Sequence, residues 1–177
     1  MIHFFQRLAR GFRREDGTAT IEFVMVVPVL LTVFMGSFES GLLMTRSIML
    51  EQSVDMTMRE LRLGHYTLPN ATLLKAEICK RTVIFPNCEA NIMVEMTRVN
   101  TSTWALPQTE VTCVDREEDI QPVTALQIGQ QNDVMLVRVC VIQDAIFPTS
   151  QFGLNLALDG QGGYGLVAVS AFVTEPS

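Results

Sequence analysis

Histidine is scarce in this chain: of 177 residues, only His3 and His65 are histidine. A serine or cysteine nucleophile needs a neighbouring base, and two isolated histidines supply no such pairing. The cysteines form no CxxC pair and no Cys/His cluster, which argues against the usual zinc sites. We therefore expect no catalytic residue, no metal site and no cofactor, and a role that is not enzymatic.

The charge is unevenly distributed along the chain. Residues 1–17 hold four arginines against Glu15 and Asp16, a net charge of +2, and because the whole chain carries −6 the remainder carries −8. An acidic body argues against nucleic acid as a partner. A basic head before an apolar segment keeps the N-terminus in the cytoplasm and sends the following chain outward. We interpret residues 1–17 as a basic leader.

A long apolar run follows this leader. From Thr18 to Phe38 the only charged residue is Glu22. As a helix, residues 18–38 span about 31 Å, close to the hydrocarbon thickness of a bilayer, and we predict that they cross a membrane. Pro28 lies inside this run; membrane helices accept proline because neighbouring groups satisfy the freed carbonyl, and we expect a helix kink there.

Small residues stand at the end of the apolar run. Gly36 with Ser40 and Ser37 with Gly41 are spaced four residues apart. This spacing lets a second helix approach closely. The same residues could instead merely ease the exit of the helix from the membrane, and both interpretations stay open.

The helical pattern continues beyond Glu39. An apolar residue recurs every seventh position, and a second set widens the stripe; the two sets are Leu42, Met49, Met56, Leu63 and Leu43, Leu50, Val54, Leu61. Gly64 is a natural stop. We predict one helix over residues 18–63, roughly 69 Å long, whose second half packs against a globular domain.

Residues 64–177 are predicted to form that domain. Asn70 or Thr72 can cap a short helix at 73–81. Runs rich in β-branched residues predict strands at 91–99, 110–115, 133–142 and 164–174, with loops at 116–131 and 143–163. The expected fold class is α+β: a long N-terminal helix packed on a small, mainly antiparallel β-sheet.

All four cysteines follow the apolar run, on the side that this topology places in an oxidising compartment. An even count favours disulfides, and three connectivities are possible. We favour Cys79–Cys88 across a local turn, and Cys113–Cys140 between two predicted strands. The alternative is four buried thiols that pack as small apolar groups.

The N-terminal pattern resembles the class III signal of type IV pilin-like proteins: a short basic leader, Gly17 before Thr18, and a glutamate, Glu22, at the fifth position after the junction. The chain looks most like the TadE group of Tad (Flp) pilus proteins, which are minor pilins or pseudopilins. Shorter similarities continue along the chain: two cysteines nine residues apart, the VMLVRV run at 134–139 after Gly129, and a final Glu-Pro.

The resemblance implies a role and partners. A prepilin peptidase would cut between Gly17 and Thr18, and the new ammonium group of Thr18 would pair with Glu22 on the same helix face, commonly in a neighbouring subunit. A carboxylate in an apolar span costs roughly a few kcal/mol unless it is paired. The implied partners are the inner membrane, the peptidase, other pilins or pseudopilins and the Tad inner-membrane assembly proteins. The C-terminal domain would be periplasmic, or extracellular within a pilus that serves adherence.

Two other interpretations compete with this one. The chain could be a permanently anchored periplasmic binding module whose helix is only a tether. It could also be a secreted domain with an ordinary signal peptide, but no Ala-x-Ala site follows the apolar core and the apolar stripe runs on beyond Glu39.

Overall fold

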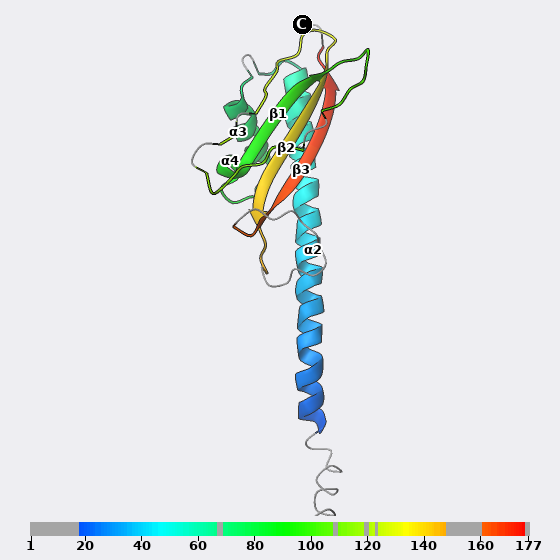
Figure 1. Cartoon of the computed structure of the whole chain (residues 1–177), viewed down its shortest axis with the longest axis vertical. Coiled ribbons are helices and arrows are strands. Elements are labelled where there is room, and N and C mark those ends of the chain that lie inside the picture. Colours follow the sequence, from blue (N-terminus) through cyan, green and yellow to red (C-terminus); the bar gives the residue numbers. More distant parts are fainter. Residues whose placement is uncertain are drawn as a thin grey trace, which may run out of the picture.

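The computed structural model describes residues 18–66, 69–107, 110–118, 121–122, 124–147 and 161–175, so the expected leader lies outside the described residues. One long helix, α2, rises from the N-terminal side and ends within a small domain of helices and strands (Figure 1). The N-terminal half of α2 projects from the domain as a stalk, and the C-terminus lies at the opposite end of the molecule (Figure 1).

Helix α2 runs from Thr18 to Arg62 and continues through Pro28. Its end is set by Gly64, whose positive φ of 73° favours a residue without a side chain. There the amide of Gly64 donates to the carbonyl of Leu61, and the amide of His65 donates to that of Glu60. These two bonds make the Schellman arrangement, which satisfies carbonyls that the last helical turn leaves open. The predicted stop at Gly64 is therefore confirmed.

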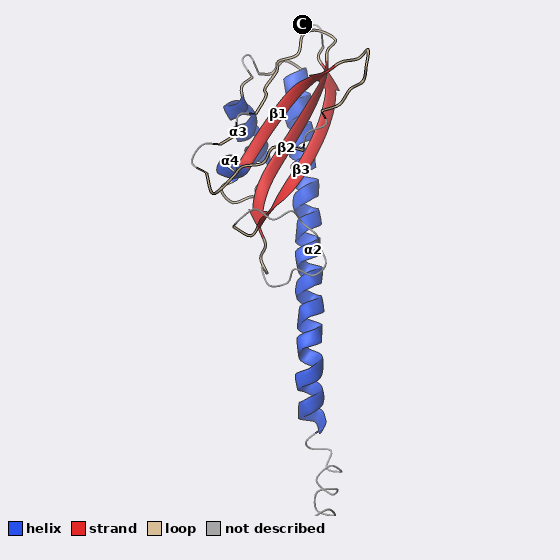
Figure 2. Ribbon diagram, in the orientation of Figure 1, coloured by secondary structure: helices blue, strands red, loops and turns tan. Residues whose placement is uncertain are grey.

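The sheet has three strands, β1 (Ile92–Val99), β2 (Val134–Asp144) and β3 (Gly163–Val173), in the order β1-β2-β3. Both pairings are antiparallel. Helices cover one face of this sheet (Figure 2). The fold is α+β, as the sequence predicted, and three of the four predicted strands form.

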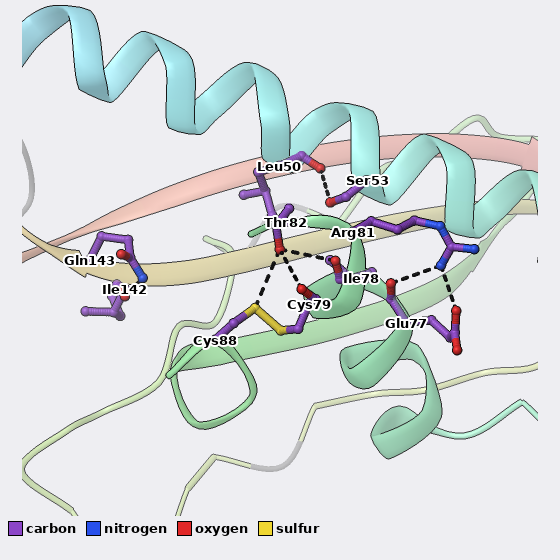
Figure 3. The surroundings of a disulfide bond; sticks show 10 residues. All are labelled: Leu50, Ser53, Glu77, Ile78, Cys79, Arg81, Thr82, Cys88, Ile142 and Gln143. Carbon is purple, nitrogen blue, oxygen red and sulfur yellow. Dashed lines mark hydrogen bonds and ion pairs between the residues drawn. A yellow bond between two sulfur atoms is a disulfide. The ribbon is translucent and has the colours of Figure 1, made fainter. Parts of the chain in front are cut away.

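Two short helices complete the helical layer. Helix α3 spans Ala71–Arg81 and begins at Asn70, whose side chain accepts a hydrogen bond from the amide of Leu73 at 2.8 Å. Helix α4 spans Cys88–Asn91 and leads directly into β1. Cys79 at the end of α3 is joined by a disulfide to Cys88 at the start of α4, the pairing favoured from the sequence (Figure 3).

The main core lies between the helices and the inner face of the sheet. Helix α2 packs chiefly on β3, and α3 packs on α2 and β1. From α2 the core takes Leu50, Val54 and Met58, with Leu43 and Leu61 at its margin. From the strands it takes alternate residues, as period-two patterning requires: Ile92, Val94, Met96, Met135, Val137, Val139, Val141, Tyr164, Leu166 and Ala168.

The buried stripe of α2 is offset from the predicted one. Met56 and Leu63 are 42% and 49% exposed, so the set that recurs at every seventh position lies at the margin of the contact. The second set, which includes Leu50 and Val54, lies at its centre. Periodicity missed this offset because Ser53 and Thr57 lie on the buried face. Their hydroxyls donate to helix carbonyls at 2.8 Å and therefore need no partner in the core.

The predicted strand at 110–115 was wrong: residues 110–118 contain no strand. This segment lies instead on the outer face of the sheet, where Cys113 forms a disulfide with Cys140 of the central strand β2. Val114 packs there with Met93 and Ile142 in a second small core. A covalent bond to the face of the central strand holds the segment over the sheet, away from the edges where it could pair.

Candidate functional site

The stalk of α2 is the most distinctive surface of the molecule. It belongs to a helix that is long and apolar enough to cross a membrane, and the most apolar stretch of that helix is not buried against the rest of the chain. Large apolar side chains face outward on every side of it, among them Ile21, Phe23, Val24, Met25, Leu30, Val33 and Phe34. A helix that is apolar all round needs lipid or other helices to cover it.

The predicted processing junction lies at the free end of this stalk. Gly17 is outside the described residues, and Thr18 is the first residue of α2. Glu22 follows one turn later with an exposed side chain, and no other described residue forms a hydrogen bond or ion pair with it. The fold therefore offers this carboxylate no partner from the described domain, and a compensating cation would have to come from elsewhere.

The predicted packing residues lie where the stalk approaches the domain. The hydroxyls of Ser37 and Ser40 each donate to the carbonyl four residues earlier at 2.8 Å. Neither serine therefore presents an unpaired donor to an apolar neighbour. A methyl group added at Gly41 would meet nothing within 4 Å, so this side of the helix is open to a second helix. Pro28 lies inside the continuous helix α2, and the kink expected there stays a prediction.

Two charged residues that the sequence reasoning did not single out attach the stalk to the domain. The Glu39 carboxylate, only 7% exposed, accepts hydrogen bonds from the amides of Ile146 and Phe147 at 3.1–3.2 Å. Arg46, two turns later and equally buried, donates to the carbonyl of Asp144 at 3.1 Å and to the hydroxyl of Tyr164.

We call Glu39 and Arg46 the polar clamp. Glu39 binds the residues just after β2, and Arg46 binds the end of β2 and the start of β3. Together they fix the stalk-side end of the domain to one height on the helix. The detectable signal in the sequence is their spacing. Seven residues apart, they share a helix face with the buried Leu50 and Val54, and a charge on a buried face requires a partner.

The opposite end of the domain is fixed by a second polar group. Arg81 of α3 forms ion pairs with Glu60 of α2 at 2.7 Å and with Glu77 at 2.8 Å, and the Tyr66 hydroxyl donates to Glu60 at 2.8 Å. The hydrogen bonds from Tyr66 and Arg81 lower the pKa of Glu60. Burial and the Glu60 hydrogen bond raise the pKa of Tyr66 to about 12. This group ties α3 and the chain after α2 to the end of the helix.

Beside this group lies an apolar cleft of about 670 Å³ at the end of the domain farthest from the stalk. Leu61, Ile128 and Phe172 are among its lining residues, and the Arg62–Glu175 ion pair, at 3.2 Å, borders it. Thr174 also lines it, with a buried hydroxyl that no described residue hydrogen-bonds. Among the described residues, no group of three histidine, cysteine or acidic side chains is placed to hold a metal ion.

Comparison with known proteins finds a family for the stalk. The family model described as TadE-like protein matches residues 17–59, from Gly17 through most of α2. No curated protein and no solved structure matches the chain. The matched residues contain Glu22, Pro28 and the polar clamp, whereas the sheet lies outside them. Over residues 17–59 the chain is thus similar to TadE-like proteins, a family associated with the Tad pilus.

Proposed function

We propose that this protein is a minor pilin or pseudopilin of a Tad (Flp) pilus, with a structural role in pilus assembly and adherence and no catalytic one. In this proposal the precursor inserts into the bacterial inner membrane with its N-terminus in the cytoplasm. A prepilin peptidase then cuts between Gly17 and Thr18, and α2 packs among the helices of other pilins or Tad assembly proteins.

The observation that carries the proposal is the position of Glu22 on the bare stalk. A carboxylate exposed on a membrane-length helix is stable in lipid only with a partner, and the described domain supplies none. Cleavage after Gly17 would create an ammonium group at Thr18, about 6 Å along the helix axis from Glu22 and on the same face. The cut would thus supply the missing cation, from this chain or from a neighbouring subunit.

The processing step is tested by the mass of the mature chain purified from native membranes. We expect an N-terminus at Thr18, and we expect Gly17→Leu to leave the precursor uncut. Gly11→Leu is the matched control, because it places the same bulk within the leader but away from the junction, and cleavage should continue. A mature protein that retains the arginines of residues 1–17 would refute the proposal.

The assembly step is tested by substituting the carboxylate. Glu22→Gln keeps the size of the side chain and removes its charge, and we expect the protein to be lost from sheared pili while it remains in the membrane. Glu51→Gln is the control, since Glu51 is exposed on the part of α2 that lies against the domain. Equal incorporation of both variants would show that the Glu22 charge is not required.

The distal cleft favours a second candidate function, a permanently anchored binding module. An apolar cleft with an unpaired hydroxyl is the usual form of a ligand site. Under this alternative Glu22→Gln leaves function intact, whereas Phe172→Ala, which alters the cleft wall, abolishes it. The opposite result favours the pilin.

A further inference from the structure

We infer that the root of the β2–β3 loop, residues 145–147, rests on the outer surface of the lipid bilayer, so that the domain contacts the membrane as well as being tethered to it. This inference rests on the proposed function, because it requires α2 to span the membrane from Thr18. It adds a second lipid-contacting element that lies far from the helix in sequence.

The first argument is height along α2. Phe38 is twenty residues after Thr18, which places it about 30 Å along the helix, the thickness of the hydrocarbon core. The Phe38 ring meets the Phe147 ring edge-on, with their centroids 6.1 Å apart. If Thr18 lies at the inner boundary of the hydrocarbon, the loop root lies at the outer one.

The second argument is the chemistry of the contact. Ile146 is 48% exposed although it is apolar, and it adjoins the exposed Phe34 and Phe38 of the helix through Phe147. These four residues form a continuous apolar surface, which we call the basal patch. An apolar surface that continues directly from a membrane-length helix is suited to the boundary between headgroups and acyl chains.

The third argument is that two backbone amides of the loop root are already hydrogen-bonded within the protein. The amides of Ile146 and Phe147 already donate to the buried Glu39 carboxylate. Asp144, just before the patch, is paired with Arg116 at 2.8 Å. Backbone groups bonded within the protein are the condition for placing a non-helical segment against lipid. The polar clamp therefore prepares the loop root for this environment.

The test uses tryptophan fluorescence of the full chain in vesicles of phosphatidylethanolamine and phosphatidylglycerol, with and without bromine atoms near the headgroup end of the acyl chains. The reporter is Ile146→Trp in a Trp104→Phe background. Ile146 is half exposed, so the larger ring needs no space in the core. Native Trp104, 65% exposed on the turn after β1 at the far end of the domain, is the control.

We expect brominated lipid to quench the emission of Ile146→Trp and to leave the emission intensity of native Trp104 unchanged. A third chain, Phe34→Trp in the same background, reports the span itself. Quenching of Phe34→Trp without quenching of a tryptophan at residue 146 or at residue 147 overturns the inference and leaves the membrane span standing. This includes the case in which a second copy covers the patch. Absence of quenching at both positions refutes the span and the inference with it.

A second reporter protects the test against a local folding defect. Phe147→Trp replaces one aromatic ring by another, at a position whose amide stays bonded to Glu39. We expect it to be quenched as Ile146→Trp is. Unquenched emission from both reporters, in chains that retain the far-ultraviolet circular dichroism of the native protein, overturns the inference.

Discussion

Removal of the Cys113–Cys140 disulfide should destabilise the domain more than removal of Cys79–Cys88. The two bonds differ in the length of chain that they close: the sequence separation is 27 for the first and 9 for the second. The perturbation is a double alanine variant of each pair, Cys113→Ala with Cys140→Ala and Cys79→Ala with Cys88→Ala.

The magnitude follows from these separations. Closing a loop of 27 residues restricts the unfolded chain by about 3.6 kcal/mol at 25 °C, and closing one of 9 residues by about 2.6 kcal/mol. The constant part of both figures cancels, so the threefold ratio of lengths alone gives a difference of about 1 kcal/mol. Because Cys140 is fully buried beside Met93 and Ile142, its truncation also opens a cavity, which increases the difference.

Urea unfolding of the full chain in detergent micelles would measure both costs. Near-ultraviolet circular dichroism follows the domain, because Tyr164 is buried in its core, while the apolar stalk remains in the micelle. The free energy of unfolding comes from the midpoint and the slope, and a changed slope would reveal an expanded denatured state. Equal costs for the two pairs, or a larger cost for Cys79–Cys88, would refute the loop-closure reasoning.

Three further predictions concern α2 and the residues at its distal end. Leu50→Ala should lower the free energy of unfolding by about 2–5 kcal/mol because Leu50 is buried against the sheet. The control Ile48→Ala, on the exposed side of the helix, should change it by less than about 0.5 kcal/mol. Similar effects of the two substitutions in the urea assay would contradict the assignment of the buried face. Hydrogen bonds from Tyr66 and Arg81 lower the pKa of Glu60 from 4.5. The stability that ionised Glu60 contributes is therefore complete above pH 4.5 and is lost as the pH falls through the folded-state pKa. In Glu60→Gln the free energy of unfolding should depend less on pH in this range. The pKa of Tyr66 is raised to about 12, so the stability that its protonated hydroxyl contributes is complete below pH 10.0 and is lost as the pH rises towards 12. Tyr66→Phe should remove the step near pH 12 from the tyrosinate absorbance. A step that persists in this variant would contradict the assignment to Tyr66.

The parts of the fold that local chemistry determines could be predicted from the sequence. An uninterrupted helical pattern and Gly64 gave the extent of α2 to within one residue at its C-terminal end. The runs at 133–142 and 164–174 became β2 and β3, because each alternates residues between a core face and an outer face. Asn70 was one of two residues, with Thr72, predicted to cap α3, and the structure shows that Asn70 does so by accepting a hydrogen bond from the amide of Leu73.

The parts that depend on distant contacts could not be predicted. The segment at 110–115 has strand composition, and its disulfide to Cys140 was favoured from the sequence. Because Cys140 lies on the central strand, the bond holds the segment over the face of the sheet and not at an edge, and the strand order that decides this could not be predicted. The polar clamp was missed for a similar reason. In the sequence Glu39 is only the first charged residue after the apolar run. Its role depends on the amides of residues 146 and 147, which are distant in the sequence.

The polar clamp also constrains how far α2 can move relative to a membrane. Among the described residues Glu39 is the first buried side chain of the helix, so the protein begins to cover α2 at a carboxylate and not at an apolar residue. A shift of one turn towards the cytoplasm would draw Glu39 and its bonded loop root into hydrocarbon, at a cost in desolvation. A shift of one turn outward would expose the apolar residues before Phe38 to water. Both shifts are unfavourable, so in the proposed topology the clamp holds the spanning segment at the length between Thr18 and Glu39.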